Sequence, residues 1–345
     1  MTFQLRDDQI TDLGYFMNKP LAINGNEPGT GKTPVVCVLQ RYQWDQHGAA
    51  TIWVMPKTLL EKNREEAIRF GGWDSKDVVI IDGTPAEVEV QLLLPAKLFL
   101  MGFQRFKLIM EAGGFPERFT SFHADEYHKG FGGHESQQTQ AMYKFMQKQG
   151  KFFLPMTGTI VNGKLDTAYP PMQVIEPAYY GNFKAFQNFH HIIDLFTGKR
   201  CGFRNHAHLR DVLGDHGTYR KWTDIFGPEM KIIQRETVPM EPEARALYDK
   251  FEAEAVLELE KFFIDGTLPG VAFIRARQLM EHPNRFPDLT EFGRWVDIIP
   301  GKRNGKVERL DLHITNHVEN DTPVVIFAAM VPQQREIFAS KHPAK

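Results

Sequence analysis

Short apolar runs alternate with longer, helix-compatible polar stretches over the first half of the chain, and this alternation most constrains the fold. Six runs are predicted to be strands, at residues 21–24, 51–55, 78–82, 97–101, 119–124 and 151–156. Each ends in a cluster of Gly, Pro, Asp or Thr, where parallel α/β sheets place their functional loops. Strands that alternate with crossover helices pair in parallel. The sequence therefore predicts an α/β fold with a parallel sheet.

The pattern changes after about residue 175. The middle of the chain is rich in His, Arg and aromatic side chains and lacks evenly spaced strands, which predicts a mainly helical insertion. Its clearest helix is expected at residues 245–263, where apolar residues recur at helical spacing. The alternation then resumes, with a helix expected at 306–317 and a buried strand at 323–329. The predicted parts are residues 1–175, 176–300 and 301–345.

Composition restricts the functional class. The 345 residues carry a net charge of -2, so contact with a phosphate backbone has to come from local basic patches. The two cysteines, Cys37 and Cys201, lie far apart, which indicates a reducing compartment. Charges occupy the N-terminus where a signal peptide has its apolar core, and no apolar run approaches the ~18 residues of a membrane span. We therefore expect a soluble cytoplasmic protein without a targeting signal.

The octet NEPGTGKT follows the first predicted strand and precedes a helix-compatible run. Gly29 and Gly31 allow the backbone to wrap around phosphate. Lys32 places positive charge on the β and γ phosphates of a nucleotide, and the Thr33 hydroxyl can ligate Mg²⁺. Asn26 replaces the first glycine of the motif GxxxxGK[ST]; because Asn tolerates a left-handed backbone, the change is expected to be mild. The predicted phosphate-binding residues are Glu27, Pro28, Gly29, Thr30, Gly31, Lys32 and Thr33. A chance glycine turn is the alternative.

A second motif, FHADEYH at residues 122–128, ends an apolar run in two adjacent acids. At a strand end, Asp125 is expected to ligate Mg²⁺ and Glu126 to orient and deprotonate an attacking water. A charged loop beside a satisfied histidine is the alternative. Asp125 follows Lys32 by 93 residues, which leaves room for two or three βα units and one shared crevice. Lys32, Asp125 and Glu126 are therefore the predicted catalytic residues.

A third motif, MTGTIVN at residues 156–162, follows the sixth predicted strand. Its small hydroxyl residues can sense the γ phosphate through hydrogen bonds to the acidic motif and pass that state to a neighbouring domain. A plain Thr/Gly turn is the alternative for this segment alone. Three such loops in this order predict a site for ATP and Mg²⁺.

With these motifs, the chain resembles the superfamily 2 helicase-fold ATPases, and among them the Swi/Snf-type DNA translocases. The family's LRxYQ element is matched by LRDDQ, its DEMGLGKT by NEPGTGKT, its DEAH by residues 125–128, and its TGTPxxN by residues 157–162. The resemblance implies a RecA-like first lobe, a helical insertion and the start of a second RecA-like lobe. It also implies that Gln9 reads adenine. The other implied nucleotide contacts are Arg6, His128, Thr157, Gly158 and Thr159.

Nucleic acid, above all double-stranded DNA, is the partner that the resemblance implies. Residues 198–235 carry eight Lys/Arg against four acids, with aromatics between them, which suits a phosphate backbone. A solvated basic face of the insertion is the alternative. The candidate contacts are Pro56, Lys57, Thr58, Arg105, Asn162, Arg220 and Lys221. Four histidines (190, 191, 206 and 208) could hold zinc, but without paired cysteines surface or packing roles are favoured.

The second lobe is expected to be incomplete, because the segments that supply the arginine finger in relatives do not occur before Lys345. A further C-terminal segment or a protein partner would complete it. The leading hypothesis is an ATP-dependent motor stimulated by duplex DNA. The alternatives are an unwinding helicase acting on RNA or single strands, and an ATP-gated binding module with little turnover of its own.

Overall fold

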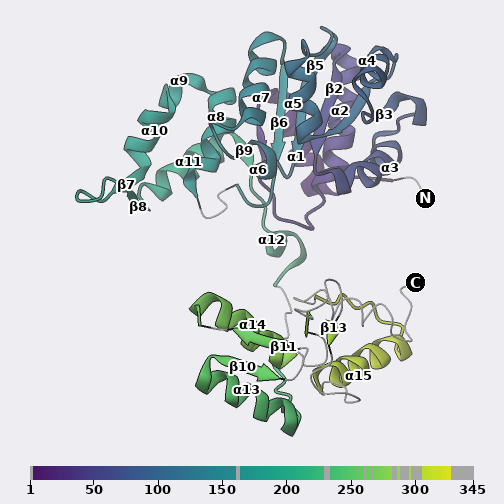
Figure 1. Ribbon diagram of the computed structural model, residues 1–345. Helices are drawn as coiled ribbons and strands as arrows, with labels where there is room; N and C mark the ends of the chain where they lie inside the picture. The colour runs from purple at the N-terminus through teal and green to yellow at the C-terminus, as the bar shows by residue number, and fades with distance from the viewer. Residues whose placement is uncertain are drawn as a thin grey trace. The chain divides into compact units, whose positions relative to one another are not determined.

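The computed structural model describes residues 3–160, 164–228, 234–259, 262–265, 267–281, 286–287, 295–296 and 305–327 (Figure 1). The chain divides into two compact units, Met1–Met230 and Lys231–Lys345. The predicted boundaries after residues 175 and 300 do not coincide with this division, and the three-part organisation stays a prediction.

The first unit is built on a seven-stranded sheet in the order β3-β4-β2-β5-β6-β1-β9, and all its strand pairs are parallel. Its strands are β1 (Ile23–Asn24), β2 (Ala50–Met55), β3 (Val78–Ile80), β4 (Leu98–Gly102), β5 (Phe119–Asp125), β6 (Phe152–Met156) and β9 (Gly217–Thr218). The six predicted strands are all present within two residues of their expected bounds, which confirms the parallel α/β class. The seventh, β9, was missed because two residues without an apolar run give no strand pattern.

Helices cover both faces of this sheet. They are α1 (Asp7–Asn18), α2 (Lys32–His47), α3 (Leu60–Gly71), α4 (Pro85–Leu93), α5 (Phe103–Glu111), α6 (His128–Phe131), α7 (Gln137–Lys148) and α8 (Tyr169–Ile175), with single 3₁₀ turns η1 (Lys57–Leu59), η2 (Ser75–Asp77) and η3 (Leu165–Ala168). Successive side chains of a strand point to opposite faces. In β2, Ile52 packs in the core that includes Phe106 of α5, whereas Trp53 packs in the core that includes Val36 of α2. Burial on both faces explains why the strands read as continuous apolar runs.

Residues 177–228 complete the first unit. They form α9 (Pro177–Tyr180), α10 (Phe183–His190), the hairpin strands β7 (His191–Ile193) and β8 (Arg200–Phe203), α11 (His206–Asp215), β9 and α12 (Trp222–Phe226). The hairpin lies at the edge of this unit, at the left of Figure 1. Because β9 pairs with β1, this part of the chain belongs to the main sheet as well as to the helices beside it.

The second unit corrects two sequence expectations. It contains α13 (Pro242–Glu254), β10 (Val256–Leu259), β11 (Phe262–Asp265), α14 (Pro269–Glu281), β12 (Phe286–Pro287), β13 (Trp295–Val296) and α15 (Gly305–Glu319). The helix expected at 245–263 ends at Glu254, because Ala255 takes a left-handed conformation (φ 56°) and the next apolar residues pair as the hairpin β10-β11. The helix expected at 306–317 is confirmed by α15.

The strand expected at 323–329 is wrong over its described part. Residues 323–327 form no strand, and Val325 and Phe327 are 77% and 93% exposed, so the apolar run is not buried here. Residues 328–329 lie outside the described residues. Within the described ranges, no helix combines the length and apolar character needed to cross a bilayer.

Candidate nucleotide-binding site

The octet NEPGTGKT forms the loop between β1 and α2. Both of its glycines take a left-handed backbone, with φ of 82° at Gly29 and 85° at Gly31. A Cβ on Gly31 would lie 2.5 Å from Nε2 of Gln9, so any larger residue would displace the Gln9 side chain. The first N–H groups of a helix lack intrahelical acceptors and carry partial positive charge. The start of α2 at Lys32 therefore offers an anion site of the kind that holds phosphate.

Lys32 lies over this loop, where its Nζ donates to the backbone oxygens of Asn26 and Glu27 at 2.7 and 3.1 Å. Burial lowers the pKa of the Lys32 ammonium, and the nearby charges of Asp125 and Glu126 act in the opposite direction. The lysine of the first motif therefore lies within electrostatic range of the acids of the second. A partly buried ammonium at a helix N-terminus suits the phosphates of a nucleotide.

Asn26 owes its place to its side chain, because its backbone does not take the left-handed conformation that Asn tolerates. Its Nδ2 donates to Oδ2 of Asp12 at 2.7 Å, and its Oδ1 accepts from the backbone N–H of Arg220 at 2.8 Å. Arg220 Nε also donates to Oδ1 of Asp12 at 2.7 Å. Asp12 and Asn26 are 2% and 4% exposed. These hydrogen bonds of the Asp12–Asn26–Arg220 cluster hold the first residue of the loop in place.

The N-terminal segment fixes the other side of the loop. Nε2 of Gln9 donates to the Gly31 oxygen at 3.0 Å, and Arg6 Nη2 donates to the Thr30 oxygen at 2.6 Å. The backbone N–H of Arg6 in turn donates to Oε1 of Gln9 at 3.0 Å. Gln9 and Arg6, both predicted nucleotide contacts, therefore contact the phosphate-binding loop directly. That Gln9 contacts adenine stays a prediction.

Asp125 ends β5, in register with Met156 of β6, which is itself in register with Asn24 of β1. Since adjacent strands lie about 4.8 Å apart, Asp125 and Asn24, two residues before the octet, are about 10 Å apart across the sheet. Asn63 Nδ2 donates to Oδ2 of Asp125 at 3.2 Å, and the Glu126 N–H donates to Oδ1 at 3.0 Å.

Burial raises the pKa of Asp125, so its ionised form is not fully compensated by these hydrogen bonds. A divalent cation at this carboxylate would supply the missing charge compensation, and oxygen ligands are those that Mg²⁺ prefers. The donor set therefore fits Mg²⁺. Thr33, in the first turn of α2, is the second predicted ligand.

The acidic turn and the TGT turn are in contact. Nδ1 of His128 lies 2.8 Å from Oγ1 of Thr157 and 3.5 Å from Oε2 of Glu126. Glu126 has φ of 47°, a conformation that costs a non-glycine residue about 1–2 kcal/mol. Such strain persists where the surrounding structure fixes it, as in functional sites.

Gly158 connects the TGT turn with the phosphate-binding loop. A Cβ on Gly158 would lie 2.4 Å from Cδ of Pro28. In the same turn, the Thr159 N–H donates to the Thr157 hydroxyl at 3.0 Å. The three predicted loops therefore meet at one edge of the sheet.

The predicted nucleic-acid contacts have diverse surroundings. Lys57 and Thr58, in η1 after Pro56, are exposed, as is Lys221. Arg105 donates to Oδ1 of Asp82 at 3.2 Å and to the Gly83 oxygen at 2.6 Å. Arg220 is paired with Asp12, as described above. Asn162 lies outside the described residues. Contact of these residues with nucleic acid stays a prediction.

Sequence reasoning missed three residues that shape the site. Asp12 is the buried carboxylate that accepts the hydrogen bond of Asn26. Asn63 orients Asp125 by donating to its carboxylate. The Trp222 N–H donates to Oε2 of Glu27 at 2.8 Å. None belongs to a local phosphate-binding motif, so only spatial contacts reveal them. The histidines at 190 and 191 are buried within the fold, with hydrogen bonds to Tyr180 and Asp166.

A parallel sheet that presents a glycine loop at a helix N-terminus, an Asp-Glu pair and a TGT turn along one edge defines a RecA-like P-loop nucleotide-binding fold. Among solved structures, the chain is similar to the SWI2/SNF2 ATPase core of Sulfolobus solfataricus, solved in complex with dsDNA. The TM-score is 0.54 at 16% identity, over 98% of this chain and 69% of that chain. This likeness confirms, at the level of the fold, the α/β architecture that the sequence resemblance predicted.

Two structures of the UvsW helicase of bacteriophage T4 match more distantly. Their TM-scores are 0.40 and 0.39 at 15% and 14% identity, over 49% and 48% of this chain and 58% and 32% of theirs. No protein-family model and no curated protein sequence matches the chain.

Proposed function

We propose that this protein is a nucleic-acid-dependent ATPase, and specifically a Swi/Snf-type motor that moves along duplex DNA. The observation that carries the proposal is the convergence of three loops at one sheet edge. Lys32 lies close enough to Asp125 and Glu126 for their charges to act on its pKa, and Gly158 packs against Pro28 of the phosphate-binding loop. Each loop supplies a different requirement of phosphoryl transfer.

In this proposal the loop at residues 29–33 holds the phosphates of ATP, and Lys32 binds the β and γ phosphates. Thr33 and Asp125 hold Mg²⁺, which supplies charge neutralisation on the transferred phosphoryl group when bound. Glu126 accepts a proton from the attacking water. His128 and Thr157 link that acid to the TGT turn, so the turn can respond to the γ phosphate.

Duplex DNA is the proposed activator. The SWI2/SNF2 core that shares the fold was solved in complex with dsDNA. Lys57 and Thr58, exposed after β2, and Lys221, exposed before α12, can reach phosphate oxygens without breaking a described ion pair. Affinity should then fall steeply with salt and depend little on base sequence.

ATP hydrolysis measured with duplex DNA, single-stranded DNA and RNA tests the proposal. We expect the strongest stimulation by duplex DNA. Glu126→Gln should retain ATP binding and lose about 10²- to 10⁴-fold in turnover, the usual contribution of a general base. Lys32→Ala should lose both binding and turnover. Glu117→Gln, an exposed acid outside the site, is the matched control and should behave as wild type.

Each hypothesis predicts a different result. DNA-stimulated hydrolysis that Lys32→Ala leaves unchanged would place the chemistry elsewhere and refute the assignment. Stronger stimulation by RNA or single strands would favour an unwinding helicase. Tight ATP binding with equal, negligible turnover in wild type and Glu126→Gln under saturating DNA would favour an ATP-gated binding module.

A further inference from the structure

The turn between β7 and β8 holds two large apolar side chains in solvent. Leu195 is 95% exposed and Phe196 is 100% exposed, the highest values among the large hydrophobic residues of the described chain. Scattered apolar residues on a surface need no explanation, but an adjacent pair at the tip of a hairpin at the edge of the unit does (Figure 1). Such a pair is suited to insertion into a partner.

Polar contacts give the turn a defined shape. Oδ1 of Asp194 accepts the N–H groups of Phe196 and Thr197 at 2.9 and 2.7 Å, and the Thr197 hydroxyl at 2.9 Å. These bonds lower the pKa of Asp194, the Thr197 N–H having the largest effect. Gly198, with φ of 67°, donates its N–H to the Asp194 oxygen at 2.9 Å. The apolar pair is thus presented by an ordered turn.

The base of the hairpin is fixed to the body of the first unit. Asp166 accepts a hydrogen bond from His191 of β7 on one oxygen and from Arg200 of β8 on the other, each at 2.5 Å. The next residue, Thr167, accepts the hydroxyl of Tyr127 on its backbone oxygen, and Tyr127 directly follows Glu126. Contacts therefore run from the acidic motif to both strands of the hairpin.

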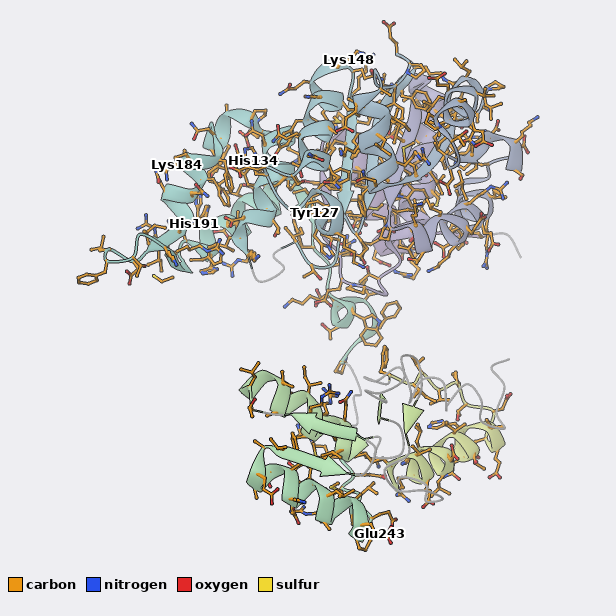
Figure 2. The ribbon with its side chains drawn as sticks, in the orientation of Figure 1. Tyr127, His134, Lys148, Lys184, His191 and Glu243 are labelled. Atoms are coloured by element: carbon orange, nitrogen blue, oxygen red, sulfur yellow. The ribbon has the colours of Figure 1, made fainter. Side chains whose placement is uncertain are left out.

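The surroundings of the hairpin are basic. Residues 183–211 contain five Lys/Arg (Lys184, Lys199, Arg200, Arg204 and Arg210) and two acids (Asp194 and Asp211), a net charge of +3, whereas the whole chain carries -2. Two of these cations are paired, Arg200 with Asp166 and Arg210 with Asp211. Lys184 and Arg200 line a cavity of about 320 Å³ beside His191, at the base of the hairpin. Figure 2 shows Lys184 and His191 on this side of the unit. A partner that binds both the apolar tip and the basic residues around it must present an apolar surface flanked by negative charges.

We propose that the β7-β8 hairpin is a wedge that inserts Leu195 and Phe196 between base pairs of duplex DNA. Proteins that deform DNA insert side chains of this kind at a base step and bend the duplex, while basic residues hold the phosphates on either side. Stacked bases are apolar and flanked by phosphates, which matches the apolar tip and basic surroundings. This inference rests on the proposed function and adds a base contact to it.

A base analogue reports the insertion. We would measure binding of wild type and of the double variant Leu195→Ser/Phe196→Ser to a duplex containing 2-aminopurine, whose fluorescence rises when it unstacks. Wild type should raise the signal. The tip variant should abolish the rise and bind about 5- to 100-fold more weakly, the range for losing one base–side-chain stack. Because both side chains are fully in solvent, folding and ATP binding should not change.

Two controls separate the wedge from general effects. Val90→Ser/Leu93→Ser removes another exposed apolar pair, 64% and 77% exposed on α4, and should leave affinity and fluorescence as in wild type. Lys199→Gln should reduce the salt dependence of binding by about one phosphate contact and keep the fluorescence rise.

The outcomes distinguish the wedge from the motor. If wild type binds duplex DNA and hydrolyses ATP but the tip variant matches it in affinity and fluorescence, the wedge is refuted and the proposed function stands. If wild type binds no nucleic acid, both fail. If the tip variant changes only the self-association of the chain, measured by sedimentation, the hairpin is a protein contact and the wedge is refuted.

Discussion

Replacing Asn26 by glycine would give the octet the residue that its motif carries at the first position, yet we expect the change to destabilise the protein. Asn26 donates to a buried carboxylate, Asp12, at 2.7 Å and accepts from the Arg220 N–H at 2.8 Å. A hydrogen bond to a charged group contributes about 1.5–3 kcal/mol and a neutral one about 0.5–1.5 kcal/mol. Loss of both should lower the free energy of unfolding of the first unit by about 2–4 kcal/mol, and its Tm by about 5–15 °C.

Urea denaturation followed by tryptophan fluorescence would measure this change. Asn205→Gly is the matched control, because Asn205 has φ of 60°, which glycine adopts without strain, and its side chain makes an exposed hydrogen bond to the Phe189 oxygen. We expect the control to lie within about 0.5 kcal/mol of wild type. If Asn26→Gly were as stable as wild type, the Asp12–Asn26–Arg220 cluster would contribute nothing, and our reasoning about this position would be wrong.

Three further changes test other contacts. Burial lowers the pKa of His123 to about 3, so its neutral form is favoured in the fold and its contribution to stability falls as pH drops below about 6.5. Between pH 7.5 and pH 5, urea titrations should show a loss of stability that is about 2 kcal/mol smaller in His123→Gln than in wild type. Thr157→Val removes the hydroxyl 2.8 Å from His128, so steady-state assays should show turnover reduced about tenfold with ATP affinity retained. Gly158→Ala places a Cβ 2.4 Å from Pro28, so calorimetry should show weakened nucleotide binding.

Local sequence patterns predicted those parts of the fold that depend on local chemistry. Strands buried on both faces are continuous apolar runs, so β2, β4 and β5 were found close to their true ends. The glycine loop was also predicted from sequence, because the positive φ at Gly29 and Gly31 favours glycine over other residues. The same reasoning failed where contacts between distant parts of the chain determine the local structure.

The failures have specific physical causes. Residues 245–263 satisfy a helical period, but pairing between Val256–Leu259 and Phe262–Asp265 takes the second half of that run into a hairpin. The role of Asn26 depends on residues 14 and 194 positions away, a separation that no sequence window covers. Asn63 orients Asp125 from 62 positions away, a contact that no local pattern indicates.

The late arrival of β9 has a consequence for how the protein is made. β1 and the octet are synthesised before β9 and Arg220, which complete their surroundings and follow about 194 residues later. At 5–20 residues per second, synthesis of the intervening chain takes about 10–40 s. During that interval β1 has no partner on one side, and open strand edges invite pairing with other chains. The strand that leads into the octet is therefore open to pairing with other chains until β9 has been made.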